Sequence, residues 1–312
     1  MIGGDEMQFY PTISRGEVTK YCNATRLMLV ASSYAAQEVR KRGKVRGNLP
    51  VPRLPETVME RAEDCGGFVA TFKWGKYPYT PAQYVAWLQG WQPQWAAMMD
   101  FCCEPEVIAK TGIVRERQRQ TTEMAYHFWQ NYKAAPWAWV PTIQGWEVED
   151  YQRHAREMKP LIEEMAACYG TESAFRVGIG TLCRRASVDM IHQVVRAVNE
   201  ILPGVPLHLW GVKLGLLQSP LALPECVASV DSAAWNGLFR TGREEWKTSG
   251  LPQRRWIFDV ALPRYQAKVE QALSVPKQTI LIWSREASPY SPTASYVDNE
   301  ARESIPQQRG EA

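Results

Sequence analysis

Short apolar runs alternate along the chain with longer stretches in which apolar residues recur at helical spacing. This alternation is typical of βαβ units, and it predicts a parallel sheet rather than a sandwich. The apolar runs predict seven strands, at residues 26–32, 67–72, 95–101, 138–143, 175–179, 206–210 and 226–230. We expect an eighth at 256–260 or 279–283, because periodicity does not decide between these two runs.

The stretches between the runs predict helices at residues 81–91, 112–133, 148–169, 187–201 and 263–273. Thr80 and Pro81 suit the N-cap and first position of the first of these helices. The helix at 187–201 has one apolar face, as the outer helix of a barrel requires. The pattern therefore predicts an α/β fold, a (β/α)8 TIM barrel. An open doubly wound sheet is the alternative, although its G-x-G-x-x-G motif is missing after the first strand.

Length and polarity along the chain predict how it divides into domains. A barrel of this type takes roughly 250 residues, so we expect a single barrel domain over residues 1–283. Residues 284–312 are polar and poor in apolar side chains, which predicts an extended or disordered tail. We see neither a secretory signal nor an apolar run long enough to cross a bilayer, and we expect a cytoplasmic protein with no membrane partner.

Composition adds two constraints. Seven cysteines, an odd number scattered through apolar segments, do not resemble a disulfide framework, so we expect reduced thiols. A net charge of +3 does not by itself indicate nucleic-acid binding. Arginine clusters, Arg184 with Arg185 and Arg240 with Arg243, are candidates for a local phosphate-binding patch, and ordinary solvated surface is the alternative interpretation.

The informative residues lie at the predicted strand ends, where the active site of a parallel barrel is built. In chain order they read DCGGF at 64–68, DFC at 100–102, QG at 144–145, GIG at 178–180, HLWGV at 208–212 and VD at 230–231. This order resembles the tRNA-guanine transglycosylase superfamily, whose series runs D-S-G-G-F, D-x-C, Q-G, a glycine pair, Y-L-M-G-V and F-D. The resemblance covers residues 26–236, most of the chain.

The resemblance implies an enzyme that exchanges a purine base on a nucleic acid. Asp231 matches the nucleophile of the family, and Asp64 matches the general acid/base that serves the leaving and incoming bases. Asp100 and Gln144 match the residues that recognise the edge of the base.

Three further positions match the groups that surround the purine in the family. Gly178 matches a glycine whose backbone N–H meets the purine carbonyl oxygen, with a shift of one residue, to Val177 or Ile179, left open. Phe68 and Trp210 match the residues that sandwich the ring, and packing in the core is their alternative role.

The residue types suit this chemistry independently of the resemblance. Exchange of a base at C1′ passes through an oxocarbenium-like state, so one carboxylate can form a glycosyl-enzyme intermediate while a second group handles the proton. Asp231 and Asp64 fit that scheme. A guanine-like base presents an N1–H and an amine side by side, which an acceptor such as Asp100 can take, while the Gln144 amide can donate to the ring carbonyl.

The chain also departs from the tRNA enzymes. Their C-x-C-x-x-C and later histidine, which have the spacing of a structural zinc site, are missing here, because Cys226 is the last cysteine and His208 the last histidine. We therefore expect no zinc at that location and no cofactor. Val69 stands where the tRNA enzymes often have glutamine, and Trp210 replaces their methionine.

These departures favour the compact branch that modifies DNA, found in phages and some bacterial defence islands. The expected partners are DNA, with a flipped or single-stranded guanine, and a free 7-deazaguanine base such as 7-cyano-7-deazaguanine. Arg184, Arg185, Arg240 and Arg243 are the candidates for holding phosphates. The alternatives are a tRNA-guanine transglycosylase without zinc, a hydrolase that releases the base to water, and a barrel that binds purine or nucleic acid without catalysis.

Overall fold

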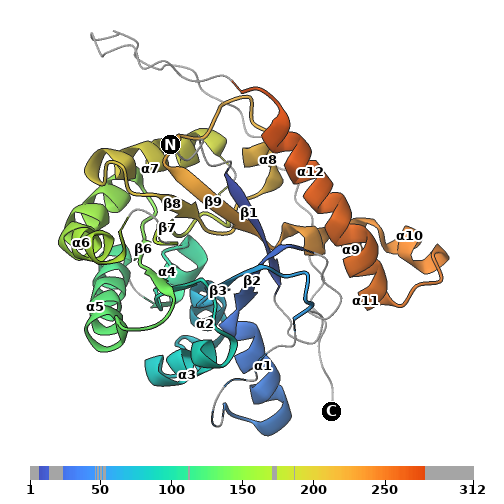
Figure 1. Cartoon of the computed structure of the whole chain (residues 1–312), viewed down its shortest axis with the longest axis horizontal. Helices are drawn as coiled ribbons and strands as arrows, with labels where there is room; N and C mark the ends of the chain where they lie inside the picture. Colours follow the sequence, from blue (N-terminus) through green and yellow to red (C-terminus); the bar gives the residue numbers. More distant parts are fainter. Residues whose placement is uncertain are drawn as a thin grey trace. The chain divides into compact units, whose positions relative to one another are not determined.

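Parallel strands and helices alternate in the structure, a computed structural model of the chain (Figure 1). It describes residues 7–13, 24–45, 47, 49, 51, 54–111, 113–170, 174–185 and 187–277, without the side chains of residues 110, 111, 236, 239 and 240. The strands in this part are β1 (Gln8–Ile13), β2 (Arg26–Val30), β3 (Glu60–Asp64), β4 (Trp95–Ala97), β5 (Ala138–Val140), β6 (Thr142–Ile143), β7 (Val177–Ile179), β8 (Leu207–Leu209) and β9 (Val227–Ser232).

The strands form one parallel sheet that curls into a nearly closed barrel. Their order is β5-β4-β3-β2-β1-β9-β8-β7-β6, so β5 pairs with β4 and β6 pairs with β7. These two end strands are consecutive in the chain and are separated only by Pro141, which has no N–H to give to a ladder. The chain itself therefore joins the two ends of the sheet, and the predicted α/β fold of the TIM-barrel type is confirmed.

Helices connect the strands and lie around the barrel (Figure 1). They are α1 (Ala31–Arg42), α2 (Gly67–Trp74), α3 (Pro81–Trp91), α4 (Pro105–Thr111), α5 (Val114–Tyr132), α6 (Val148–Tyr169), α7 (Val188–Ile201), α8 (Leu214–Leu217), α9 (Leu238–Thr241), α10 (Arg243–Thr248), α11 (Gln253–Trp256) and α12 (Leu262–Ser274). Thr80 caps α3 as predicted, since its side chain accepts the N–H of Gln83. No helix among these combines the length and the apolarity that a bilayer crossing requires.

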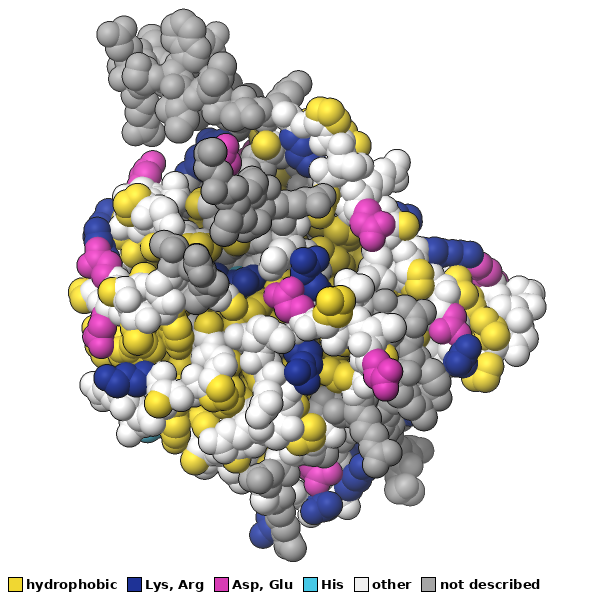
Figure 2. Space-filling view, viewed as in Figure 1, with side chains coloured by type: hydrophobic (Ala, Val, Ile, Leu, Met, Phe, Trp, Pro, Cys, Tyr) yellow, Lys and Arg dark blue, Asp and Glu magenta, His cyan; other side chains and the backbone are white. Residues whose placement is uncertain are grey.

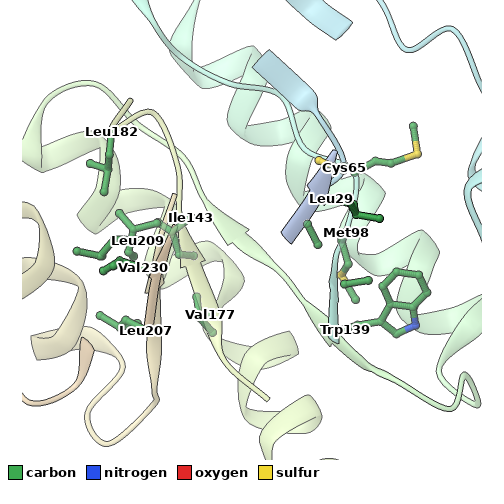
Figure 3. Packing of buried hydrophobic residues seen from close by; sticks show 14 of the residues in the cluster. Leu29, Cys65, Met98, Trp139, Ile143, Val177, Leu182, Leu207, Leu209 and Val230 are labelled. Atoms are coloured by element: carbon green, nitrogen blue, oxygen red, sulfur yellow. The ribbon is translucent and has the colours of Figure 1, made fainter. Parts of the chain in front are cut away.

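The buried apolar residues form two clusters, one on each side of the strands. The smaller fills the inside of the barrel with Tyr10, Met28, Ala62, Trp95, Ala138 and Val140. The larger lies between the strands and the helices, and Figure 3 shows part of it, with Val177, Leu209 and Val230 close together on neighbouring strands. Because the interior is packed with side chains below the strand ends, the space for a ligand lies at the carboxyl end of the barrel.

The strand predicted at 67–72 is wrong, because this segment forms the helix α2. The strand is β3, directly before it, with the polar sequence ERAED. Gly66 has a φ of 73°, a left-handed conformation that turns the chain between β3 and α2. As a result Asp64 is the last residue of a strand, which is where a barrel places catalytic groups.

Neither of the two segments offered for the eighth strand supplies it within the described residues. The 256–260 segment is helical, as the end of α11 and a π-helical turn at Ile257–Ala261. The 279–283 segment, like the predicted tail at 284–312, lies outside the described residues. The missing strand is β1, which pairs with both β2 and β9.

Candidate active site

A cavity of about 410 Å³ opens at the carboxyl ends of the strands. Six of the residues selected from the sequence line it: Asp64, Phe68, Asp100, Gln144, Trp210 and Asp231. They come from positions spread over most of the chain, at or just after the ends of β3, β4, β6, β8 and β9. The fold thus gathers the acids, the amide and two aromatic rings around one space.

Asp231 lies near the end of β9 and is held by several donors. Its Oδ1 accepts the backbone N–H of Gly211 at 2.6 Å and faces Nε2 of His208 at 3.3 Å. Its Oδ2 accepts the hydroxyl of Thr12 from β1. Only 4% of the residue is exposed. These donors hold the Asp231 carboxyl group in a fixed orientation.

Asp64, which ends β3, has different surroundings. Its Oδ1 accepts the backbone N–H of Gly66 at 2.8 Å. Burial raises the pKa of its carboxyl to about 7, against the lowering effect of the Gly66 N–H; the charges of Asp231 and Asp100 raise it further. Asp64 is therefore balanced between its protonated and charged forms near neutral pH, which is the property of a general acid that later serves as a base.

Asp100 and Gln144 contact each other in the cavity wall. The Gln144 Nε2 donates to Asp100 Oδ2 at 2.6 Å, and the Cys65 thiol lies 3.3 Å from Asp100 Oδ1. Burial raises the pKa of Asp100, while hydrogen bonds from Cys65, Gln144 and Tyr77 lower it. Together they present a carboxyl oxygen and an amide N–H side by side, a pattern complementary to a guanine-like edge.

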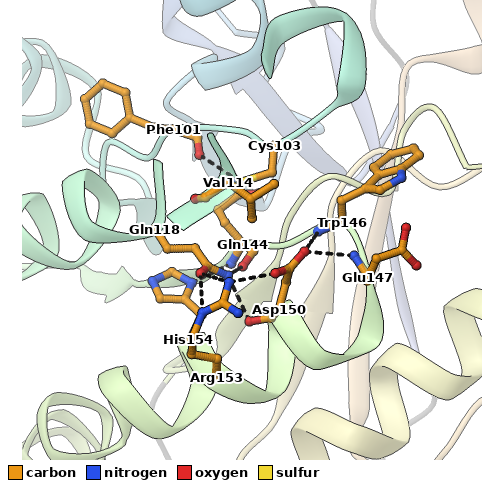
Figure 4. Close-up of polar contacts among 10 residues, drawn as sticks. All are labelled: Phe101, Cys103, Val114, Gln118, Gln144, Trp146, Glu147, Asp150, Arg153 and His154. Carbon is orange, nitrogen blue, oxygen red and sulfur yellow. Dashed lines mark hydrogen bonds and ion pairs between the residues drawn. The ribbon is translucent and has the colours of Figure 1, made fainter. Parts of the chain in front are cut away.

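The orientation of Gln144 is fixed by a network of buried residues from α5 and α6 (Figure 4). Its backbone N–H donates to His154 Nδ1 at 2.8 Å, and its carbonyl oxygen accepts Gln118 Nε2 at 2.7 Å. Its side-chain Oε1 accepts the hydroxyl of Thr181 at 2.5 Å. Since Oε1 is occupied by a donor, Nε2 is the atom that faces Asp100. Burial lowers the pKa of His154 to about 3, so its Nδ1 is free to accept.

The aromatic residues lie at the rim and the wall. Phe68, in the first turn of α2, is parallel to Phe72, with ring centroids 5.5 Å apart, and the Arg184 guanidinium lies 5.3 Å from the Phe68 ring. Trp210 lies just after β8 and lines the cavity. Its ring centroid is 4.3 Å from that of His208. Both residues thus line the space that a flat ligand would occupy, and Arg184 contacts the ring of the first.

The comparison with family models matches residues 38–245 to the family described as DpdA, DeoxyPurine in DNA protein A. The chain belongs to this family. The match covers two thirds of the chain and includes Asp64, Asp100, Gln144 and Asp231. No curated protein matches the chain. Membership of the DpdA family supports an enzyme of the transglycosylase type that modifies DNA, and it implies DNA as the substrate.

The assignment to Gly178 has to be corrected in this DpdA-family site. Gly178 does not line the cavity, and its N–H donates to the Pro141 carbonyl at 2.8 Å inside the barrel. A Cβ at Gly178 would lie 2.0 Å from Nε1 of Trp210, so the glycine makes room for that ring. Gly180, two residues on, does line the cavity, and a Cβ there would lie 2.3 Å from Nε2 of Gln144.

The arginines predicted to hold phosphates occupy different environments. Arg184 is exposed at the rim, whereas Arg185 is 8% exposed and lies 4.3 Å over the ring of Trp146, which does not suit contact with a DNA backbone. Arg243 is exposed on α10, and the side chain of Arg240 lies outside the described residues. On the face that Figure 2 shows, the basic side chains are scattered among acidic ones and form no single basic patch.

Two charged residues that line the cavity were not singled out from the sequence. Lys213, after β8, is exposed and brings a positive charge to the cavity. Glu104 is 1% exposed, its Oε1 is 3.3 Å from the Cys183 thiol, and burial raises its pKa. The only sequence signal for Glu104 is an acid that follows the apolar segment at 95–103. Supporting residues such as Gln118 and His154 lie on helices and carry no strand-end signal.

Proposed function

We propose that the chain exchanges guanine in DNA for a 7-deazaguanine base, such as 7-cyano-7-deazaguanine, through a covalent aspartyl-glycosyl intermediate. The observation that carries this proposal is the convergence of Asp64, Asp231 and the Asp100–Gln144 pair on one cavity. The family match supports DNA as the polymer that is modified.

In the first half of the reaction, Asp231 attacks C1′ of the deoxyribose and the C1′–N9 bond breaks. The electron pair of that bond leaves with the guanine, which takes the proton of Asp64. The donors around Asp231 hold its carboxylate in place for attack. The raised pKa of Asp64, about 7, makes its proton available near neutral pH.

In the second half, the deprotonated Asp64 takes the N9 proton of the incoming base, and N9 attacks C1′. The bond between C1′ and Asp231 breaks, its electrons return to the carboxylate, and Asp64 is protonated as at the start. Two displacements at one carbon retain the configuration of the sugar. No cofactor enters this scheme, because the two carboxyl groups supply the nucleophile and the proton.

We assign base recognition to the cavity wall and contact with the DNA strand to the rim. Asp100 would accept the N1–H and exocyclic amine shared by guanine and its 7-deaza analogues, and Gln144 would donate to the carbonyl. The nucleotides beside the extruded one would contact the exposed ring of Phe72 and the exposed charges of Arg184 and Lys213.

Incubation of the chain with labelled 7-cyano-7-deazaguanine and either DNA or tRNA tests the proposal. We expect label in DNA with release of one guanine for each base inserted, and no label in DNA with the Asp231→Asn variant. Label in tRNA alone would support the tRNA alternative. Guanine release without a free base would indicate a hydrolase, and binding without exchange would indicate a non-catalytic barrel.

A further inference from the structure

A line of buried polar side chains runs through the barrel to the nucleophile proposed above. Arg176 Nη1 donates to Ser229 Oγ at 2.7 Å, Ser229 Oγ lies 2.8 Å from His208 Nδ1, and His208 Nε2 lies 3.3 Å from Asp231 Oδ1. Ser229 and His208 have no exposed surface, and Arg176 is 7% exposed. Burial of polar groups is unfavourable unless they are paired. The hydrogen bonds along this line pair its buried groups, so the line is a stable part of the barrel interior.

The guanidinium at the start of the line is itself held in place. It lies 4.7 Å from the ring of Trp95 and 6.0 Å from that of Tyr10, both inside the barrel. Its Nε also donates to the carbonyl of Ala174 at 3.1 Å. The positive charge is therefore anchored to β1, β4 and the segment before β7, while the other end of the line reaches β8 and β9.

The protons on this line can be assigned from its two ends. Burial lowers the pKa of His208, Asp231 opposes this shift and Arg176 adds to it, so the imidazole is neutral. An ionised Asp231 only accepts hydrogen bonds, which places the imidazole proton on Nε2. His208 Nδ1 then accepts, and its donor is the hydroxyl of Ser229, whose oxygen accepts from Arg176. Every hydrogen bond therefore points towards the nucleophile.

We propose that Arg176, Ser229 and His208 form a relay that positions Asp231 for attack on C1′ by directing an imidazole N–H at Oδ1. The relay rests on the function proposed above, in which Asp231 is the nucleophile. His208 is then a positioning residue, and it exchanges no proton with either base. A neutral donor suits this task, because an imidazolium would pair with the carboxylate and weaken it as a nucleophile. When Asp231 departs in the second half, the same N–H stabilises its returning charge.

Variants along the relay test this assignment. Ser229→Ala removes the middle link without touching Asp231, and we expect kcat about tenfold lower, with the affinity for free base unchanged. His208→Leu should lower kcat at least as much, and His208→Gln, which restores an N–H donor, should recover part of the loss. His192→Gln is the matched control, since His192 is a buried histidine of α7 that takes no part in the hydrogen bonds of this line.

A double variant separates positioning from general loss of structure. If Ser229 acts through His208, the pair Ser229→Ala with His208→Leu should have the kcat of His208→Leu alone. Additive losses, or wild-type kcat in both single variants while the wild-type protein exchanges bases, would overturn the relay. Thermal unfolding of each variant shows whether the fold persists.

Nitrogen-15 spectra of labelled histidine give a measurement that does not depend on activity. The chain has only four histidines, so the signal of His208 can be assigned by its loss in His208→Gln. We expect a neutral ring with the proton on Nε2 at about pH 7, and a weaker preference for Nε2 in Ser229→Ala. An Nδ1-protonated ring or an imidazolium would refute the relay. Absent base exchange with the expected spectrum would instead refute the proposed function.

Discussion

The ends of β3 and β9 each carry an aspartate into the same cavity, yet the two carboxyl groups have different surroundings. Asp231 faces the backbone N–H of Gly211, the Thr12 hydroxyl and the His208 ring. Asp64 accepts the N–H of Gly66 and has its pKa raised to about 7 by burial, with the charges of Asp231 and Asp100 adding to the effect. Donors favour a fixed negative charge, whereas burial beside other acids favours an exchangeable proton. In the proposed reaction, these surroundings divide the roles of two identical side chains.

The largest expected effect is that of Asp231→Asn. An amide in this position keeps the shape of the side chain but is a poor nucleophile, so we expect base exchange to fall by about 10⁴-fold or more. Binding of free 7-cyano-7-deazaguanine should persist, because Asp100 and Gln144 are unchanged. Rates measured with labelled base and DNA check this, and exchange at the wild-type rate would remove Asp231 from the mechanism.

Asp64→Asn should have the next largest effect. The variant keeps the nucleophile but cannot give or take the proton, and we expect kcat about 10²- to 10⁴-fold lower. Glu63→Gln is the matched control, because Glu63 is a fully buried acid of the same strand that does not line the cavity. Similar losses of kcat in both variants would mean that acids in β3 act through stability rather than proton transfer.

A smaller loss of kcat is expected when one of the donors around Asp231, at the end of β9, is removed. Thr12→Val removes the hydroxyl that donates to Asp231 Oδ2 and keeps the shape of the side chain. We expect kcat to fall by about tenfold, as for the loss of one hydrogen bond to a charged group. Thr12→Ser retains the hydroxyl and should stay near the wild-type rate. Equal rates in the two variants would show that this donor does not matter for attack.

Asp64 should also make the stability of the fold depend on pH. The folded-state pKa of Asp64, about 7, exceeds its value in an unfolded chain, about 3.9, so the folded state binds the extra proton between these values. Stability from this group is therefore full below about pH 4 and lost as the pH rises towards 7. In Asp64→Asn this loss should be absent, which chemical unfolding at several pH values measures. A parallel pH dependence in both proteins would contradict the raised pKa.

The strands that were predicted correctly from the sequence are continuous apolar runs, and the two that were missed, β3 and β1, do not form such runs. In β3, Glu60 faces the barrel interior, where it accepts the Tyr10 hydroxyl, and Arg26 pairs with it at 2.8 Å. β1 likewise carries Tyr10 inside and interrupts its apolar pattern with Pro11. The run at 67–72 has strand-forming residues, but the turn at Gly66 starts a helix there. Contacts with distant segments thus determine β3 and β1, whereas a local turn overrides strand propensity at 67–72.

The acids and the amide of the candidate site were easier to predict than the residues that orient them. Asp64, Asp100, Gln144 and Asp231 could be found because parallel strands end on one face and their motifs follow a fixed order. The residues that orient them, such as Thr181 and His154, depend on distances across the fold that no local pattern encodes. Gly178 shows that a motif does not identify which of its residues lines the cavity, because Gly180, two residues later, lines it instead.

The absence of a side chain at Gly180 limits which substitutions this position can accept. A methyl group would meet the Gln144 amide at 2.3 Å, so the loop after β7 and the amide share one allowed geometry. Alanine at this position removes no reactive atom but would push the amide away from Asp100, and in the proposed reaction this shift would change which base is accepted. Gly180, a residue without chemistry of its own, is therefore a position at which a deliberate substitution would alter the selectivity of the proposed reaction.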